Sequence, residues 1–169
     1  MSQEAGRRTA RLWRRILPSH PSPGQAPPDM REVDRRDAEI LGTLLFEAFR
    51  GTIDDAGQSE MQYVQKVEAI LDGRYGDWVC AASWNFVDYG TLRSVCLVSD
   101  YKPYGCPVIA VVATAPEYKL SGDANTLLDA AVRSLAVLGY SDCCAMVTVG
   151  NRASDRLFSS CGFVSDGHS

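Results

Sequence analysis

The sequence has almost no histidine, and neither copy falls where a packed core would form. The two histidines are His20, within a proline-rich stretch, and His168, next to the last of the 169 residues. Ser-His-Asp catalysis, Cys-His catalysis and most zinc sites use an imidazole as base or ligand. The sequence therefore argues against all three and predicts a protein without a metal cofactor.

The six cysteines lack the spacings that mark zinc-binding or redox motifs. Cys143 and Cys144 are adjacent in an apolar stretch typical of a strand, where neighbouring side chains point to opposite faces. The two thiols therefore cannot easily bind one metal together. We expect the cysteines to be small buried side chains in a reducing compartment.

Long apolar runs are also missing. No run approaches the ~18 residues that a membrane-spanning helix needs, and the N-terminus lacks the apolar segment of a secretory signal. We therefore expect a soluble, cytoplasmic protein with no membrane partner. With 46% hydrophobic residues, the chain suffices for one packed core and is too short for two comfortable domains.

The net charge of −4 is unevenly distributed along the chain. The first 30 residues carry five arginines against two acidic residues, which gives this segment +3 and leaves −7 on the rest. An acidic domain lacks the basic face that neutralises phosphates, so we expect no nucleic-acid partner. The same charge favours a small cationic substrate.

Residues 1–29 have the composition of a disordered, basic and proline-rich N-terminal extension, and we place a single domain at residues 30–169. Five arginines precede a linker with five prolines, which favour extended, unpacked chain. The apolar residues of the basic part have helical spacing, so a surface-binding helix and a transit-like segment are alternatives. A start codon assigned too far upstream is another. The disordered interpretation predicts that deletion of residues 1–29 leaves folding intact.

The rest of the chain alternates between helical and strand patterns. Met30 to Val33 predicts a short strand, and the next apolar positions predict a helix that ends at Gly51. Ser59 and Gln62 have the form of a capping box at the start of a second helix. The other predicted elements are strands at 78–87 and 91–99 joined as a hairpin, a buried strand at 107–114, a helix through 127–138, a strand at 143–149 and a short helix at 151–161. This order favours a mixed sheet with helices on both faces.

The segment after the buried strand at 107–114 has the form of an anion-binding turn. It reads PEYKLSGDA before the next helix, and Lys119, Gly122 and Ala124 carry the pattern. A glycine-containing turn that enters a helix exposes unpaired backbone N–H groups, and the helix dipole adds partial positive charge. Such a turn can hold a pyrophosphate.

A second pattern begins 35 residues after Pro116, the distance that one helix and one strand require. It consists of Asn151, Ser154, Leu157, Phe158, Gly162 and Phe163. Together the two patterns resemble the GNAT superfamily of N-acetyltransferases. The resemblance implies an α/β (mixed α+β) fold, with a central mixed twisted sheet and helices on both faces, and acetyl-CoA as co-substrate.

The resemblance also implies which residues bind the coenzyme. In this family the pantetheine arm lies between two splayed strands, here lined by residues 112–115 and 147–151, and a main-chain N–H near Ala113 would polarise the thioester carbonyl. The implied cofactor-binding residues are Ala113, Thr114, Ala115, Lys119, Leu120, Ser121, Gly122, Asp123, Ala124, Asn125 and Asn151.

Three residues depart from the family's pattern. Leu120 stands where glycine is common, and Asp123 puts an acid into a turn that should bind an anion. Phe158 replaces a tyrosine whose hydroxyl serves many family members as the general acid. The sequence therefore assigns no acid.

A catalytic base is equally unassigned. The candidate carboxylates are Asp54, Asp55, Asp100 and Glu117. Asp54 and Asp55 lie on a polar loop that in this fold borders the acceptor pocket, where they could hold a substrate ammonium. Glu117 precedes the helix and could equally be a helix-entry charge.

The function that these observations favour is acetyl transfer from acetyl-CoA to a primary amine, of a small cationic metabolite, by direct attack in a ternary complex. A degenerate domain that binds a ligand or partner without catalysis is one alternative. A protein N-acetyltransferase is another. Because dimers are common in the superfamily, a homodimer is a further expectation.

Overall fold

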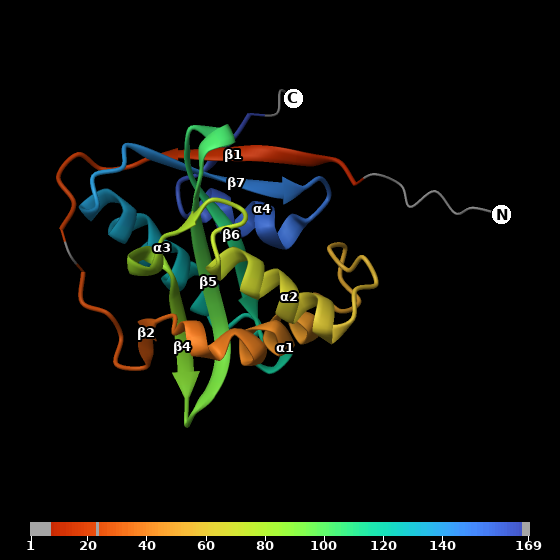
Figure 1. The fold of residues 1–169 in the computed structure, drawn as a ribbon. Helices are drawn as coiled ribbons and strands as arrows, with labels where there is room; N and C mark the ends of the chain where they lie inside the picture. The colour runs from red at the N-terminus through yellow and green to blue at the C-terminus, as the bar shows by residue number, and fades with distance from the viewer. Residues whose placement is uncertain (1–7, 23, 167–169) are drawn as a thin grey trace.

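The structure, a computed structural model, describes residues 8–22 and 24–166, which form one mixed sheet with helices on both faces (Figure 1). The strand order in the sheet is β2-β4-β5-β6-β7-β1-β8, and β3 pairs with β5 off this path. The strands are β1 (Ala10–Ile16), β2 (Met30–Glu32), β3 (Asp77–Trp78), β4 (Trp84–Asp88), β5 (Thr91–Tyr101), β6 (Cys106–Thr114), β7 (Asp142–Thr148) and β8 (Val164–Ser165). The α-helices are α1 (Ala38–Phe49), α2 (Glu60–Leu71), α3 (Asp123–Val137) and α4 (Arg152–Ser160). The expected mixed α+β fold is confirmed.

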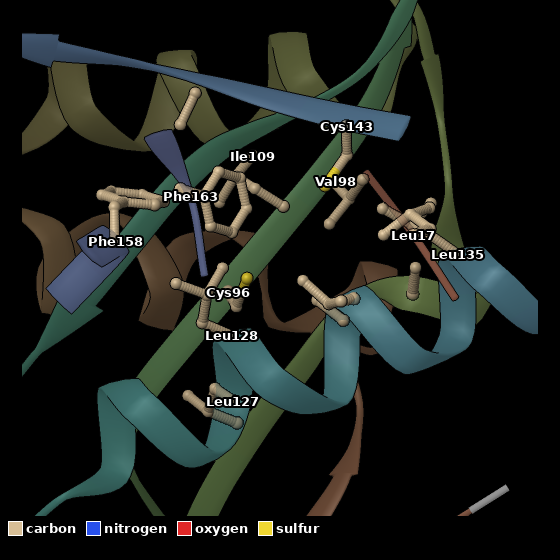
Figure 2. Packing of buried hydrophobic residues seen from close by; sticks show 14 of the residues in the cluster. Leu17, Cys96, Val98, Ile109, Leu127, Leu128, Leu135, Cys143, Phe158 and Phe163 are labelled. Atoms are coloured by element: carbon tan, nitrogen blue, oxygen red, sulfur yellow. The ribbon is translucent and has the colours of Figure 1, made fainter. Parts of the chain in front are cut away.

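Two hydrophobic clusters, one on each side of the sheet, hold the helices in place. Helices α1 and α2 lie side by side on one face and bury Leu41, Leu45 and Val67 against β5 and β6 (Figure 1). On the other face, α3 turns its leucines toward Cys96 and Val98 of β5, as Figure 2 shows. Within residues 8–22 and 24–166 no helix is both long and apolar enough to cross a membrane.

Local signals explain where most elements begin. The Ser59 hydroxyl accepts the N–H of Gln62 while the Gln62 side chain accepts the N–H of Ser59, so the predicted capping box of α2 is confirmed. The run predicted as one strand at 78–87 is divided into β3, a 3-10 turn at 80–82 and β4. The buried hydroxyl of Ser83 accepts hydrogen bonds from Trp78 Nε1 and the Val98 N–H, which fixes this break.

The structure corrects the interpretation of the N-terminal segment as disordered or helical. Ala10–Ile16 forms β1, which pairs antiparallel with β7 along its whole length and with β8 on its other edge. Leu17 follows and is only 5% exposed, within the α3-side cluster. The part of the predicted extension at residues 1–7 lies outside the described residues.

Side chains on both faces of β1 are packed, which explains why its sequence pattern did not indicate a strand. Leu12 packs beside Cys106 and Cys144, whereas its neighbour Trp13 packs against the cluster under α3. A strand that packs on both faces does not alternate between apolar and polar residues. The Arg14 guanidinium binds Asp142 of β7 at 3.1 Å, so an arginine in this basic run has a place in the fold.

Candidate active site

A gap opens in the sheet where β6 and β7 part. These parallel strands pair through Val108 and Cys144. Further along β6, Leu97 pairs with Val111 and Val98 pairs with Ile109, so Ala110 is an extra residue in β6. Such a bulge bends its strand and increases the local twist. Among the described residues, the pairing of β6 with β7 is limited to Val108 and Cys144.

A large cavity of about 540 Å³ lies at the mouth of this gap, between α1, α4 and the turn before α3. Ten of the eleven residues that the family resemblance implied line it. They are Ala113, Thr114, Lys119, Leu120, Ser121, Gly122, Asp123, Ala124, Asn125 and Asn151. The eleventh, Ala115, is buried in the cluster under α1 and α2. The cavity brings the two sequence patterns together, although their roles stay predictions.

The turn before α3 presents free backbone donors to the large cavity. Gly122 is the N-cap of α3 at φ 88°, where a side chain would be strained. Among the described residues, the backbone N–H groups of Gly122, Ala124 and Asn125 have no hydrogen-bond partner. Unpaired N–H groups and the helix dipole make this turn suitable for an anion.

Asp123 does not compete with an anion at this turn, because its carboxylate points into the protein. Arg93 Nε donates to Asp123 Oδ2 at 2.7 Å, and the Ser94 hydroxyl donates to the same oxygen at 3.2 Å. The hydrogen bond that Arg93 donates to Asp123 is the main cause that raises the pKa of the Arg93 guanidinium. Arg93 also binds Asp29 at 2.7 Å. The charge that seemed unfavourable in the sequence is therefore neutralised behind the turn.

Leu120 and Lys119 also have defined positions. Leu120 adopts the left-handed conformation, φ 67°, and its side chain is fully exposed, so it does not crowd the backbone donors. A non-glycine residue there is uncommon and strained. Lys119 Nζ donates to the Ala48 carbonyl at the end of α1, at 3.3 Å. Its ammonium stays at the edge of the large cavity.

A small pocket of about 280 Å³ adjoins the large cavity on the side of α2. Its lining residues are Arg8, Phe49, Asp54, Gln58, Tyr63, Lys66, Ala110, Val112, Thr148, Ser154, Leu157 and Phe158. Five residues, Phe49, Asp54, Val112, Ser154 and Leu157, line both spaces. The two cavities therefore meet at the gap between β6 and β7.

Asp54 is the candidate carboxylate that lies where the cavities meet. Its Oδ2 accepts a hydrogen bond from Asn151 Nδ2 at 2.8 Å. Asn151 also caps α4, because its Oδ1 accepts the N–H of Ser154 at 3.1 Å. Asn151 thus joins the α4 N-terminus to the acidic loop and orients Asp54.

The other candidate carboxylates do not line either cavity. Asp55 accepts the N–H groups of Gly51 and Gly57, each at 2.8 Å, and these bonds lower its pKa. Asp100 accepts from Lys102 and from the Tyr140 hydroxyl. Glu117 is exposed on the short turn at 116–118. Asp54 alone among the four faces the site.

Tyr63 and Phe158 line the small pocket together, and the sequence analysis did not consider the tyrosine. The Phe158 ring packs edge to face on Phe163, 5.1 Å between centroids, and Figure 2 shows the pair within the core. Tyr63 stacks on Phe49 at 6.1 Å. Burial is the main cause that raises the Tyr63 pKa, and the charges of Asp55 and Asp54 raise it further. Tyr63 therefore remains a protonated donor at neutral pH.

Sequence reasoning also missed Arg8, Gln58 and Lys66, which line the same pocket. Arg8 lies just before β1 in the segment predicted as disordered, and Lys66 lies on α2, one turn after Tyr63. The spacing of Tyr63 and Lys66 was an available signal, because residues three apart share a helix face. No signal in the sequence brings Arg8 to the pocket.

No family model matches the chain, and no curated protein matches it in sequence. Solved structures do resemble it. A GCN5-related N-acetyltransferase from Sphaerobacter thermophilus superposes with a TM-score of 0.70 at 15% identity, over 93% of this chain and 48% of that one. An aminoglycoside N-acetyltransferase solved with coenzyme A gives 0.63 at 16% identity, over 83% and 90%. A ribosomal-protein-alanine N-acetyltransferase from Brucella melitensis gives 0.63 at 19% identity, over 82% and 85%.

These comparisons define the class of fold. The chain has the fold of the GNAT N-acetyltransferases, as the two sequence patterns predicted. It spans about half the length of the Sphaerobacter protein. At these identities the likeness concerns the fold, so activity and substrate have to be argued from the site itself.

Proposed function

We propose that the protein transfers the acetyl group of acetyl-CoA to the primary amine of a small molecule, by direct attack in a ternary complex. The observation that carries this proposal is the meeting of two cavities at the gap between β6 and β7. One cavity ends at a turn with unpaired N–H groups, and the other is small and polar. Two reactants held in adjoining spaces gain much of their rate from proximity, ~7 kcal/mol or more.

The residues of the large cavity suit a coenzyme with a pyrophosphate. The N–H groups of Gly122, Ala124 and Asn125 would hold its negative charge, and Lys119 would add a cation at the edge. Acetyl-CoA, when bound, supplies an activated thioester whose carbonyl the amine can attack. The pantetheine arm would lie along β6 beside Asn151.

Strand alternation identifies the main-chain donors that could polarise the thioester carbonyl. The Ala115 N–H binds the Arg93 carbonyl of β5 at 2.8 Å. Because N–H groups in an antiparallel strand alternate between its two edges, those of Val112 and Thr114 face the gap instead. We therefore propose one of these two neighbours as the donor that the sequence predicts near Ala113. An N–H at this edge would stabilise charge on the carbonyl oxygen.

Asp54 and Tyr63 are the proposed proton-transfer groups. Asp54 would bind the acceptor ammonium and take one proton from it, which frees the electron pair of the nitrogen. The neutral amine would then attack the thioester carbonyl and form the nitrogen–carbon bond. As the carbon–sulfur bond breaks, the nitrogen would lose a second proton to the Tyr63 oxygen, which passes its own proton to the sulfur. The Tyr63 hydroxyl, which makes no hydrogen bond within the described residues, would donate a proton to the departing sulfur in place of the tyrosine that Phe158 lacks. The acceptor is cationic in the sense that its amine binds in the protonated, ammonium form.

Thermal stability with and without acetyl-CoA tests the coenzyme site. A ligand at ~100 times its dissociation constant adds about 2.7 kcal/mol, which should raise the midpoint of a protein of this size by roughly 5–10 °C. We expect Gly122→Glu to abolish this shift. Gly139→Glu is the matched control, because Gly139 also has positive φ and open space around its Cα but lies beyond the other end of α3.

Both glutamates should destabilise the free protein by about 1–2 kcal/mol, the cost of a left-handed residue, so only the ligand shift distinguishes them. No shift in the natural protein at millimolar acetyl-CoA would refute the proposal. A shift without acetyl transfer to any amine would favour a coenzyme-binding domain without catalysis, the alternative that Phe158 supports. Acetylation of peptides but not of small amines would favour a protein acceptor. Cytoplasmic location and a homodimer stay predictions.

A further inference from the structure

The walls of the small pocket carry more positive than negative charge. Arg8 and Lys66 line it as cations, and Asp54 is the single carboxylate among its lining residues. This balance was unexpected, because the acidic charge of the sequence had favoured a small cationic acceptor. The structure removes one of the two loop acids from consideration, since Asp55 binds the N–H groups of Gly51 and Gly57.

Neither cation of the pocket is neutralised by a carboxylate within the described residues. Lys66 has no hydrogen bond or ion pair there, although Asp54 exerts a weak electrostatic effect on it. The Arg8 guanidinium donates to the backbone oxygen of Asp55. The five arginines that form ion pairs elsewhere are Arg14, Arg35, Arg36, Arg93 and Arg133, and Lys102 pairs with Asp100. The two pocket cations differ from these six in having no carboxylate within ion-pair distance among the described residues.

Lys66 is accessible to a ligand. The residue is exposed overall, and partial desolvation at the pocket wall is the main cause that lowers the Lys66 pKa. Arg8 is exposed as well, so both cations can reach an anionic group in the pocket. An anionic group in the pocket would stabilise the lysine and restore its pKa.

The same pocket also offers acceptors to an amine. Gln58 lines it, and the Gln58 Oε1 atom is buried with no hydrogen-bond partner in the structure. A buried acceptor without a donor is unfavourable, and a ligand N–H group can satisfy it. Gln58 and Asp54 therefore suit one end of a ligand, and Lys66 with Arg8 suits the other.

From this arrangement we infer that the acceptor is an amino acid-like zwitterion, whose amine faces Asp54 and Gln58 and whose carboxylate binds Lys66 and Arg8. The inference rests on the proposed acetyl transfer and names the acceptor class for it. A carboxylate rather than a doubly charged group fits the balance of two cations and one acid. A diamine would place its second ammonium beside Lys66, where like charges repel.

Isothermal titration of the coenzyme A-saturated protein with matched acceptors tests this inference. Each set holds the chain length constant and changes one end, as in 4-aminobutanoate, 4-aminobutanamide and 1,4-diaminobutane, with shorter sets built on glycine and β-alanine. In the best-fitting set we expect the carboxylate to bind at least 10-fold more tightly than the diamine, with the amide between them. Lys66→Met should remove most of that preference and leave amide binding nearly unchanged.

Lys102→Met is the matched control, because Lys102 is an exposed lysine that lines neither cavity. This variant should bind the three acceptors in the same order of affinity as the natural protein. Tighter binding of the diamine, no binding of any member, or a ranking that Lys66→Met leaves unchanged would overturn the inference. Failure of the proposed function looks different. If coenzyme A does not bind, or the bound carboxylate is not acetylated, the reaction is refuted, while the ranking on the protein alone still tests the anion site.

Discussion

The large cavity and the small pocket meet at one gap but are built in different ways. Most of the large cavity comes from two continuous segments, residues 112–125 and 151–160. The small pocket takes single residues from distant parts of the chain, from Arg8 before β1 to Phe158 on α4. The first could be recognised from sequence patterns, whereas for the second the sequence indicated Asp54 and left most of the other lining residues unidentified.

This difference has a physical cause. Binding a pyrophosphate uses backbone N–H groups at a helix start, and the turn that exposes them is encoded within a few consecutive residues. Recognition of an acceptor uses side chains that long-range packing brings together. This difference can be tested by three changes in turn: deletion of strand β1, disruption of the buried Arg93–Asp123 ion pair, and substitution of the loop acids Asp54 and Asp55.

The largest effect should come from removing the most distant contribution, strand β1. Deletion of residues 1–17 leaves an edge of β7 unpaired and removes the buried Leu17 together with Trp13. Loss of one buried leucine alone costs about 2–5 kcal/mol, and whole domains are stable by only about 5–15 kcal/mol. We expect the truncated protein to lose cooperative thermal unfolding, measured by circular dichroism.

Addition of a peptide that spans residues 8–17 is the complementary measurement, because it should restore a cooperative transition by pairing with β7. An unchanged midpoint after the deletion would instead support the disordered extension that the composition predicts. It would also imply that Arg8 has no role in the acceptor pocket.

Much of the remaining fold was predictable, since α1 to α4 and the strands from β4 to β7 have local signals. Apolar patterns mark the helices and the strands, and side-chain caps also mark the start of α2 at Ser59 and of α4 at Asn151. β1 has no such signal. Its strand conformation depends on pairing with β7, which follows it by more than 120 residues in the chain. Pairing over such a distance leaves no trace in local composition.

The next largest effect should follow from breaking the ion pair behind the coenzyme turn. Arg93→Met leaves the Asp123 carboxylate, which is 7% exposed, without its cation. Removing one partner of a buried pair costs about 3–5 kcal/mol, so we expect the midpoint of thermal unfolding to fall by roughly 10 °C. Arg133→Met is the control, because that arginine pairs with Asp129 on the exposed face of α3 and should change stability by less than about 0.5 kcal/mol.

The double variant Arg93→Met with Asp123→Asn should recover part of the loss, since no uncompensated charge remains. Equal midpoints for the Arg93 and Arg133 variants would contradict this account. The sequence did reveal Asp123 as an acid in an anion-binding turn, but it could not reveal that Arg93 neutralises this charge. Arg93 lies 30 residues earlier on β5, and only the sheet brings it behind the turn.

The substitutions with the smallest structural effect distinguish the roles of two adjacent acids in the loop, Asp54 and Asp55. Asp54 lies where the cavities meet, and Asp55 binds its own loop. We expect Asp54→Asn to lower kcat/KM for acetyl transfer at least 100-fold, the lower range for loss of a general base, without altering coenzyme affinity. A decrease below threefold would exclude Asp54 from proton transfer.

Asp55→Asn is the matched neighbour and should act on stability instead of turnover. Hydrogen bonds from Gly51 and Gly57 lower the pKa of Asp55, so its stabilisation is present above the ordinary value of about 4 and is lost as the pH falls through the lower folded value. The variant should therefore show a weaker decrease in midpoint between pH 5 and pH 3 than the natural protein, while kcat/KM at neutral pH changes by less than about threefold. The reverse pattern, in which Asp55→Asn abolishes turnover and Asp54→Asn only flattens the pH profile, would exchange the roles of the two acids and move the reaction out of the gap between β6 and β7.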